Sequence, residues 1–201
     1  MRTFFRKAIL GLCASLSILS ATNEAKAADP RDGGYFEFQL SGQQQTCLGA
    51  WGGVPNNGTQ MIQYSCNPTT AARDQALTFD TNDCVWENFD GTWYQYCSIR
   101  SGKNFNKCMG TYAGSGNPGA FAVEWDCLGQ CHQDQYWLLE PGGDGSFVFW
   151  NLFSGLALGV ANITDVTNCA YLWFDCTTYV IFEEGLVSQQ NDIWIPVPAT
   201  P

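Results

Sequence analysis

The chain has little positive charge, a single histidine and no long apolar run after its N-terminal segment. Its 201 residues carry nine lysines and arginines against nineteen aspartates and glutamates, which gives a formal net charge of −10. Such an acidic surface argues against a nucleic-acid partner, because proteins of that class present basic patches. No later run approaches the roughly 18 apolar residues of a membrane-spanning helix, so we expect no membrane insertion.

Patterns for catalysis and metal binding are missing as well. One histidine, His132, excludes a metal cluster built on two histidines, and its neighbour Cys131 would point to the opposite face of a strand. Carboxylate pairs such as Glu183 and Glu184 could in principle hydrolyse glycosides, but no pattern places them in a cleft. The stretch 142–145 has one carboxylate, too few for a calcium loop. We predict a non-catalytic protein without metal or cofactor.

Residues 1–27 read as a signal peptide. Three basic residues precede an apolar run, and Ala25 and Ala27 supply the small side chains that signal peptidase requires. We expect cleavage near Ala27 and secretion of residues 28–201. Four basic residues and one acidic residue precede the cleavage site, so the net charge changes from −10 to −13. Neutral partners such as uncharged sugars remain compatible with this charge.

Nine cysteines follow the cleavage site, and in an exported protein they indicate disulfides. The predicted pairs are Cys47–Cys66, Cys108–Cys127, Cys84–Cys97 and Cys169–Cys176. The first two pairs share a separation of 19 positions, and the third pair flanks an expected hairpin. Cys131 is left over, as a free thiol, an intermolecular link or a competitor for one of these pairings.

One pattern occurs three times, in segments 33–80, 92–140 and 146–198, which we call repeats one, two and three. Each has four short runs in which apolar and polar residues alternate, a pattern typical of strands rather than helices. A Ser-Gly pair follows the first run of each repeat, which predicts one turn geometry used three times. We expect twelve strands, with the third strand of repeat three at 171–176. One unit cannot bury its apolar face alone, whereas three units around an axis can close a barrel.

The end of each repeat resembles the Gln-x-Trp motif of the ricin-type lectin family. Residues 135–137 match the motif in full, Gln75 keeps its glutamine and Trp194 keeps its tryptophan. The resemblance covers roughly 33–198 and implies one all-β domain over 28–201, a β-trefoil of three pseudo-symmetric four-stranded repeats. We expect the motif tryptophans in the core, and the motif glutamines to bond backbone groups.

The resemblance also implies a carbohydrate-binding site in each repeat. An aromatic residue two positions before the second cysteine would stack on a sugar ring, and polar residues at the start of the motif would bond its hydroxyls. The candidate residues are Tyr64, Asp74, Gln75, Trp125, Asp134, Gln135, Phe174 and Asn191. The alternative roles are packing at the core edge for the aromatics and a solvated turn for the polar residues.

One position departs from the family pattern. Galactose-binding members have an aspartate two residues after the first cysteine, where this chain has Gly49, Gly110 and Gly159. Either other groups bind the sugar, or the sugar differs, or the sites are absent. Nearby replacement candidates are Trp51, Asn57, Tyr112 and Asn117. Repeat three also has Ala157 in place of the first cysteine, so we rank repeats one and two above it.

We predict a secreted, non-catalytic carbohydrate-binding protein that recognises glycans through shallow, multivalent sites. The alternative is a cell-binding or targeting subunit of a secreted multi-protein toxin or enzyme complex, in which the domain docks a protein partner. The unpaired Cys131 and the three glycines favour this alternative. A protease inhibitor is a third possibility, against which the aromatic positions and the Gln-x-Trp pattern speak.

Overall fold

The described part of the chain is all β, with short 3-10 turns between its strands. A computed structural model describes residues 29–41, 45–67, 74–118, 120–160, 178–183 and 193–199. Its strands are β1 (Phe36–Leu40), β2 (Thr46–Ala50), β3 (Thr59–Ser65), β4 (Leu77–Phe89), β5 (Thr92–Ser101), β6 (Lys107–Thr111), β7 (Ala122–Asp126), β8 (Tyr136–Pro141), β9 (Phe147–Asn151), β10 (Ala157–Val160), β11 (Thr178–Glu183) and β12 (Trp194–Pro198). The 3-10 turns are Pro30–Asp32, Trp51–Gly53, Tyr112–Gly114, Gln133–Gln135 and Gly143–Gly145. In these ranges no helix has the length and apolarity to cross a bilayer.

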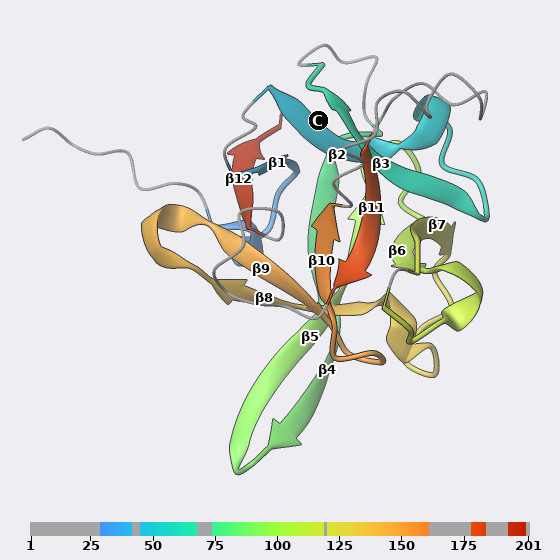
Figure 1. The fold of residues 1–201 in the computed structure, drawn as a ribbon. Coiled ribbons are helices and arrows are strands. Elements are labelled where there is room, and N and C mark those ends of the chain that lie inside the picture. Colours follow the sequence, from blue (N-terminus) through green and yellow to red (C-terminus); the bar gives the residue numbers. More distant parts are fainter. Residues whose placement is uncertain are drawn as a thin grey trace, which may run out of the picture.

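The strands close a barrel-like sheet. β1 pairs with β12 and β4, β12 with β9, β9 with β8, β8 with β5, and β5 with β4, all antiparallel. Three hairpins, β2–β3, β6–β7 and β10–β11, are joined to one another because β3 pairs with both β7 and β11 (Figure 1). A ring of this kind leaves few free strand edges, as expected for a closed all-β domain.

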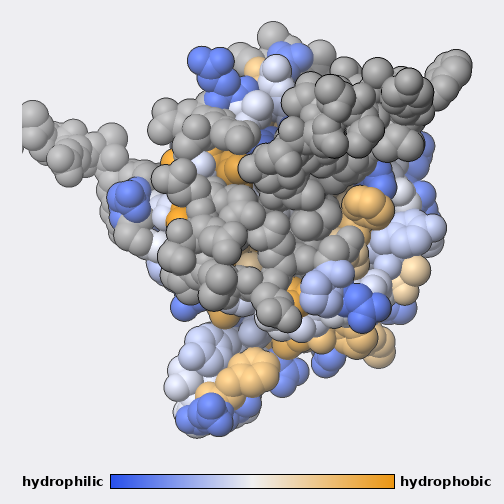
Figure 2. Space-filling view, in the orientation of Figure 1, coloured by the Kyte–Doolittle hydropathy of each residue, from blue (hydrophilic) through white to orange (hydrophobic). Residues whose placement is uncertain are grey.

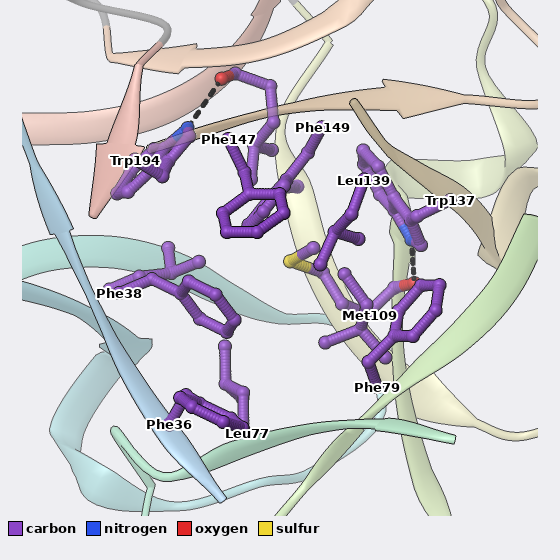
Figure 3. Close-up of a cluster of buried hydrophobic side chains, with 14 of the residues drawn as sticks. Phe36, Phe38, Leu77, Phe79, Met109, Trp137, Leu139, Phe147, Phe149 and Trp194 are labelled. Carbon is purple, nitrogen blue, oxygen red and sulfur yellow. Dashed lines mark hydrogen bonds between the residues drawn. The ribbon is translucent and has the colours of Figure 1, made fainter. Parts of the chain in front are cut away.

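The barrel interior is filled by aromatic and aliphatic side chains (Figure 3). In β1, Phe36, Phe38 and Leu40 are buried while the residues between them are partly exposed, which is the alternation predicted for a half-buried strand. Trp137 and Trp194 are fully buried, and this confirms the prediction that the motif tryptophans belong to the core. Each such side chain contributes roughly 1.5–3 kcal/mol by leaving water.

The structure contains three of the predicted disulfides within the described residues. They are Cys47–Cys66, Cys84–Cys97 and Cys108–Cys127. Cys131 is exposed and unpaired, one of the alternatives that the sequence left open. The predicted signal peptide, the pair Cys169–Cys176, and the candidates Phe174 and Asn191 lie outside the described residues.

Strands β4 and β5 are much longer than the sequence indicated. The sequence pattern predicted only short strands and a hairpin flanked by Cys84 and Cys97, but β4 and β5 pair over most of their length and project from the barrel as a two-stranded arm (Figure 1). Asp90 and Gly91 turn the tip with φ of +51° and +84°, the geometry of the tight turns that favour Asp-Gly. The predicted strand ends were wrong because the parts of β4 and β5 beyond the core do not alternate strictly between apolar and polar residues.

Two further expectations were wrong. The partner of β10 is β11 (Thr178–Glu183) and not the segment 171–176. Repeat three has Ala157 in place of the first cysteine, so no matching cysteine spacing indicates its register. The prediction rested instead on the likeness of the Phe-Asp-Cys sequence at 174–176 to the Trp-Asp-Cys sequence at 125–127, and this gave the wrong strand. The Ser-Gly turns also differ from one another, because Gly155 has a φ of +65° whereas Gly102 does not adopt a left-handed φ.

Candidate functional site

The second and third strands of repeats one and two place the two candidate aromatics in equivalent positions. Tyr64 lies opposite Cys47 in the β2–β3 register, and Trp125 lies opposite Cys108 in the β6–β7 register. The disulfides Cys47–Cys66 and Cys108–Cys127 join the same pairs of strands. The equal cysteine spacing in the sequence therefore corresponds to the same strand register and the same disulfide position in the two repeats.

The motif glutamines hold the chain that follows each second cysteine. The Oε1 atom of Gln75 accepts a hydrogen bond of 2.9 Å from the amide of Asn67, and that of Gln135 accepts one of 2.9 Å from Leu128. Their Nε2 atoms donate to the carbonyl groups of the residues before the cysteines, at 3.2 and 2.9 Å. Both side chains are buried, as the backbone-bonding expectation requires. We treat them as positioning residues.

In repeat one, the protein's own tyrosine fills the expected site. The phenol of Tyr64 donates a hydrogen bond to the carboxylate of Asp74, which is 2% exposed. Burial, together with this hydrogen bond, raises the pKa of Tyr64. A Cβ atom at Gly49 would lie 2.9 Å from Cε1 of Tyr64 and 2.7 Å from Cγ of Gln75. Glycine at this position leaves room for the tyrosine ring.

Repeat two has the opposite arrangement, because its aromatic residue faces solvent. Trp125 is 38% exposed, and its ring approaches the backbone of Gly58 in the neighbouring loop. The atoms nearest to a Cβ at Gly110 belong to Gln135 and Asp134, the latter through Oδ2 at 3.1 Å. Burial raises the pKa of the half-buried Asp134 carboxyl. An exposed indole therefore occurs in the same repeat as a partly buried carboxylate that borders Gly110.

A polar network supports the strand that carries Trp125. Nζ of Lys107 lies 2.6 Å from the carboxylate of Asp126, and Asn57 donates to the same carboxylate at 2.7 Å. The side-chain carbonyl of Asn57 accepts from the Asp126 amide at 2.9 Å. The hydrogen bond from Lys107 is the main cause that lowers the pKa of Asp126. This pair was not predicted from the sequence, although opposite charges directly before Cys108 and Cys127 are a usable signal.

Repeat three differs at the aromatic position. Glu183 lies opposite Ala157, where repeats one and two have Tyr64 and Trp125. The longer connection between β10 and β11 displaces the third strand along the sequence.

Among the replacement candidates, Tyr112 is 55% exposed in the turn after β6.

Within the described ranges, one group of potential metal ligands lies close together, and it is not a usable site. The carboxylate of Glu37 lies near the sulfur atoms of Cys47 and Cys66. These sulfur atoms are joined in a disulfide, so they are not thiolate ligands.

Comparison with known proteins identifies the fold. No protein-family model matches the sequence, and no curated protein matches it. A designed threefold symmetric protein, ThreeFoil, is 21% identical with a TM-score of 0.60, over 81% of this chain and 97% of that one. The C-half of an earthworm R-type lectin, solved with GalNAc, is 12% identical with a TM-score of 0.55, over 82% and 98%. A mosquitocidal holotoxin is 12% identical with a TM-score of 0.59, over 84% of this chain but only 17% of that one. The chain thus has the β-trefoil fold of R-type lectins.

Replacing Gly49 with alanine should lower the free energy of unfolding by about 1–3 kcal/mol, because the new methyl group would overlap Cγ of Gln75 and the ring of Tyr64. Denaturant unfolding of Gly49→Ala, Tyr64→Ala and the double variant measures this effect. If the tyrosine fills the space over the glycine, the alanine costs less in the Tyr64→Ala background. Equal costs in both backgrounds would show that the ring does not restrict this position.

Proposed function

We propose that this protein is a secreted, non-catalytic lectin that binds neutral glycans chiefly through repeat two. The supporting observation is the combination of an exposed Trp125 with an Asp134 carboxylate that borders Gly110. A pyranose ring would stack its apolar face on the indole, and the carboxylate would accept hydrogen bonds from sugar hydroxyls. The three-repeat arrangement and the signal peptide predicted from the sequence belong to the same proposal.

Several features favour repeat two over repeat one as the binding site. Repeat one buries Asp74 and covers Gly49 with Tyr64, so it offers less surface to a ligand. Repeat two leaves Trp125 exposed and Asp134 only partly buried, and the Asn57–Lys107–Asp126 network holds its third strand against the neighbouring loop. Shallow sites of this kind bind weakly, and several contacts on one glycan surface would raise the overall affinity.

Replacing Trp125 with alanine is expected to lower the apparent affinity for the bound glycan class at least about tenfold, because the stacking surface is lost. The measurement is a broad glycan array with protein made through an oxidising secretory route, so that the disulfides form. Asp134→Asn should weaken the same signals, since an amide is a poorer acceptor than a carboxylate.

Phe153→Ala is the matched control, because Phe153 is another exposed aromatic residue, at 53%, outside repeat two. Its array profile should equal that of the unaltered protein. A profile that Trp125→Ala leaves unchanged would refute the assignment of the site to repeat two. A folded protein that is silent on the array would refute the lectin function itself.

A second candidate function is a targeting subunit that docks a protein partner in a secreted toxin or enzyme complex. It is supported by the exposed, unpaired Cys131 and by the likeness to one part of a mosquitocidal holotoxin. Under this alternative, non-reducing electrophoresis of protein from its native source would show a larger disulfide-linked species that Cys131→Ser abolishes. A monomer under the same conditions would remove the thiol as support.

A further inference from the structure

A groove lies between the projecting arm β4–β5 and strand β8, and it is lined by residues other than Trp125 and Asp134. The groove has a volume of about 320 Å³ and is lined in part by Trp93, Tyr94, Gln95, Glu140 and Arg31. This volume is at the lower end of the range for small-molecule sites, which begins near roughly 300 Å³. The groove is therefore large enough for a small ligand.

One face of the arm carries two exposed indoles, each paired with an amide. In the β4–β5 register, Trp86 lies opposite Gln95, and Asn88 lies opposite Trp93. Directly opposed residues of antiparallel strands share a face, and so do residues two apart in one strand. Trp86 is 58% exposed and Trp93 is 63% exposed. The four side chains form one aromatic and polar face, which we call the arm face.

Packing of the core does not explain the arm face. The described core cluster includes Cys97 at the base of the arm but neither Trp86 nor Trp93. The pairing of β5 with β8 is recorded at Cys97 and Ser98, so the arm extends beyond the closed barrel. In Figure 2 the arm shows hydrophobic and hydrophilic surface side by side. Two large exposed indoles without a core role point to a ligand.

The polar groups around the groove suit sugar hydroxyls. Oε2 of Glu140 accepts a hydrogen bond of 2.6 Å from the Trp150 indole, which fixes the carboxylate. The guanidinium of Arg31 is bonded to Asp29 and lies 5.4 Å from the centre of the Phe147 ring. A pyranose has an apolar face for an indole and hydroxyls for amides and charged groups, so the chemistry fits a saccharide.

The arm is ordered before any ligand arrives. The Cys84–Cys97 disulfide joins its two strands at the base, and at the tip the side chain of Asn88 accepts a hydrogen bond of 3.1 Å from the Gly91 amide. On the opposite face, the rings of Phe89 and Tyr94 lie 6.1 Å apart. A pre-ordered surface loses less conformational entropy on binding, which favours affinity for a small ligand.

We propose that the arm face and the adjoining groove form a second saccharide-binding site, with Trp93 as its main stacking surface. The site goes beyond the proposed function because it uses neither Trp125 nor Asp134, although Trp93, Gln95 and Glu140 belong to the same segment 92–140. A neutral oligosaccharide would lie over Trp93 and Trp86, with Gln95 and Glu140 bonding its hydroxyls.

Saturation-transfer NMR with cellotetraose, chitotetraose, laminaritetraose and mannotetraose tests the proposal on the full disulfide-bonded protein. At least one tetrasaccharide should bind, and Trp93→Ala should weaken that binding at least about tenfold, as expected for an aromatic anchor. Trp93→Phe should restore part of the affinity, while Phe153→Ala should change nothing. Because Trp93 is largely exposed, a thermal transition equal to that of the unaltered protein will confirm that the variants fold.

The Trp125→Ala variant separates this inference from the proposed function. Tetrasaccharide binding that survives Trp125→Ala and is lost in Trp93→Ala supports the arm site. Binding that Trp125→Ala abolishes and Trp93→Ala leaves intact overturns the arm site and leaves the repeat-two function in place. If none of the four tetrasaccharides binds, the arm site is also overturned. The glycan array then remains the separate test of the site in repeat two. Loss of a protein partner in Trp93→Ala, without sugar binding, would mark the arm as a protein-docking surface instead.

Discussion

Replacing Glu124 with glutamine is expected to stabilise the protein by about 3 kcal/mol at pH 8. Glu124 in β7 is 1% exposed, and burial raises the pKa of its carboxyl to about 7 from its ordinary value of 4.5. The charge of Asp74 raises it further, while Lys107 and Lys103 act in the opposite direction. Glutamine has nearly the same shape and carries no charge, so it avoids the cost of ionising a buried acid.

The sign of the pH dependence follows from proton binding. Between about pH 4.5 and 7 the folded protein holds a proton on Glu124 that the unfolded chain has released. This contribution to stability therefore falls as pH rises through that window and is constant above it. The gain from Glu124→Gln should be below about 1 kcal/mol at pH 5 and reach its full size at pH 8.

Urea unfolding of both proteins at pH 5 and pH 8 measures the difference. Asp90→Asn is the control, because Asp90 is exposed at the tip of the arm and asparagine also tolerates its positive φ. Its stability relative to the unaltered protein should not change between the two pH values. A gain for Glu124→Gln that is equal at pH 5 and pH 8 would contradict the buried, protonated carboxyl.

Replacing Trp137 with alanine should reduce the free energy of unfolding by about 3–5 kcal/mol, the range for large aromatic deletions in a core. Trp137 is 0% exposed, and its indole nitrogen donates a hydrogen bond of 2.8 Å to the carbonyl of Met109 (Figure 3). The deletion leaves a cavity and also removes the partner of a buried carbonyl. Denaturant unfolding with a common slope for both proteins measures the loss.

Trp137→Phe separates the two contributions, because phenylalanine keeps most of the volume but has no donor for Met109. We expect it to cost about 1–3 kcal/mol, the penalty for an unsatisfied buried polar group plus a smaller void. Trp93→Ala removes an indole that is 63% exposed and should change stability by no more than about 0.5 kcal/mol. Similar losses for Trp137→Ala and Trp93→Ala would disprove the core role of Trp137.

The two motif tryptophans show why part of the fold was predictable. The indole of Trp137 donates a hydrogen bond to the carbonyl of Met109, and that of Trp194 donates one to the carbonyl of Leu158, both at 2.8 Å. Each acceptor is the residue after the position of the first cysteine, which is Cys108 in repeat two and Ala157 in repeat three. A local motif that recurs in register must bury the same surface and satisfy the same backbone groups each time. The sequence pattern therefore predicted the core positions and the disulfides Cys47–Cys66 and Cys108–Cys127.

The candidate site was predictable only in its residue positions. Tyr64 and Trp125 occupy equivalent places, yet the first ring turns onto Gly49 and bonds Asp74 while the second faces solvent. No spacing rule distinguishes these outcomes, since both residues are aromatic and both precede a cysteine by two positions. The choice depends on the volume and hydrogen-bond partners that other strands bring to each ring.

The sequence by itself determined the all-β character, the paired cysteines and the buried tryptophans, because alternation and repeat spacing act locally and restrict each strand on its own. Only the tertiary structure decided the β10–β11 register, the length and projection of the β4–β5 arm, and the burial of Glu124. These features arise where segments far apart in the chain meet, as when β7 pairs with β3 at Glu124 and Thr59. Contacts between distant segments determine the burial and solvation of each group, and a local sequence pattern does not specify those contacts.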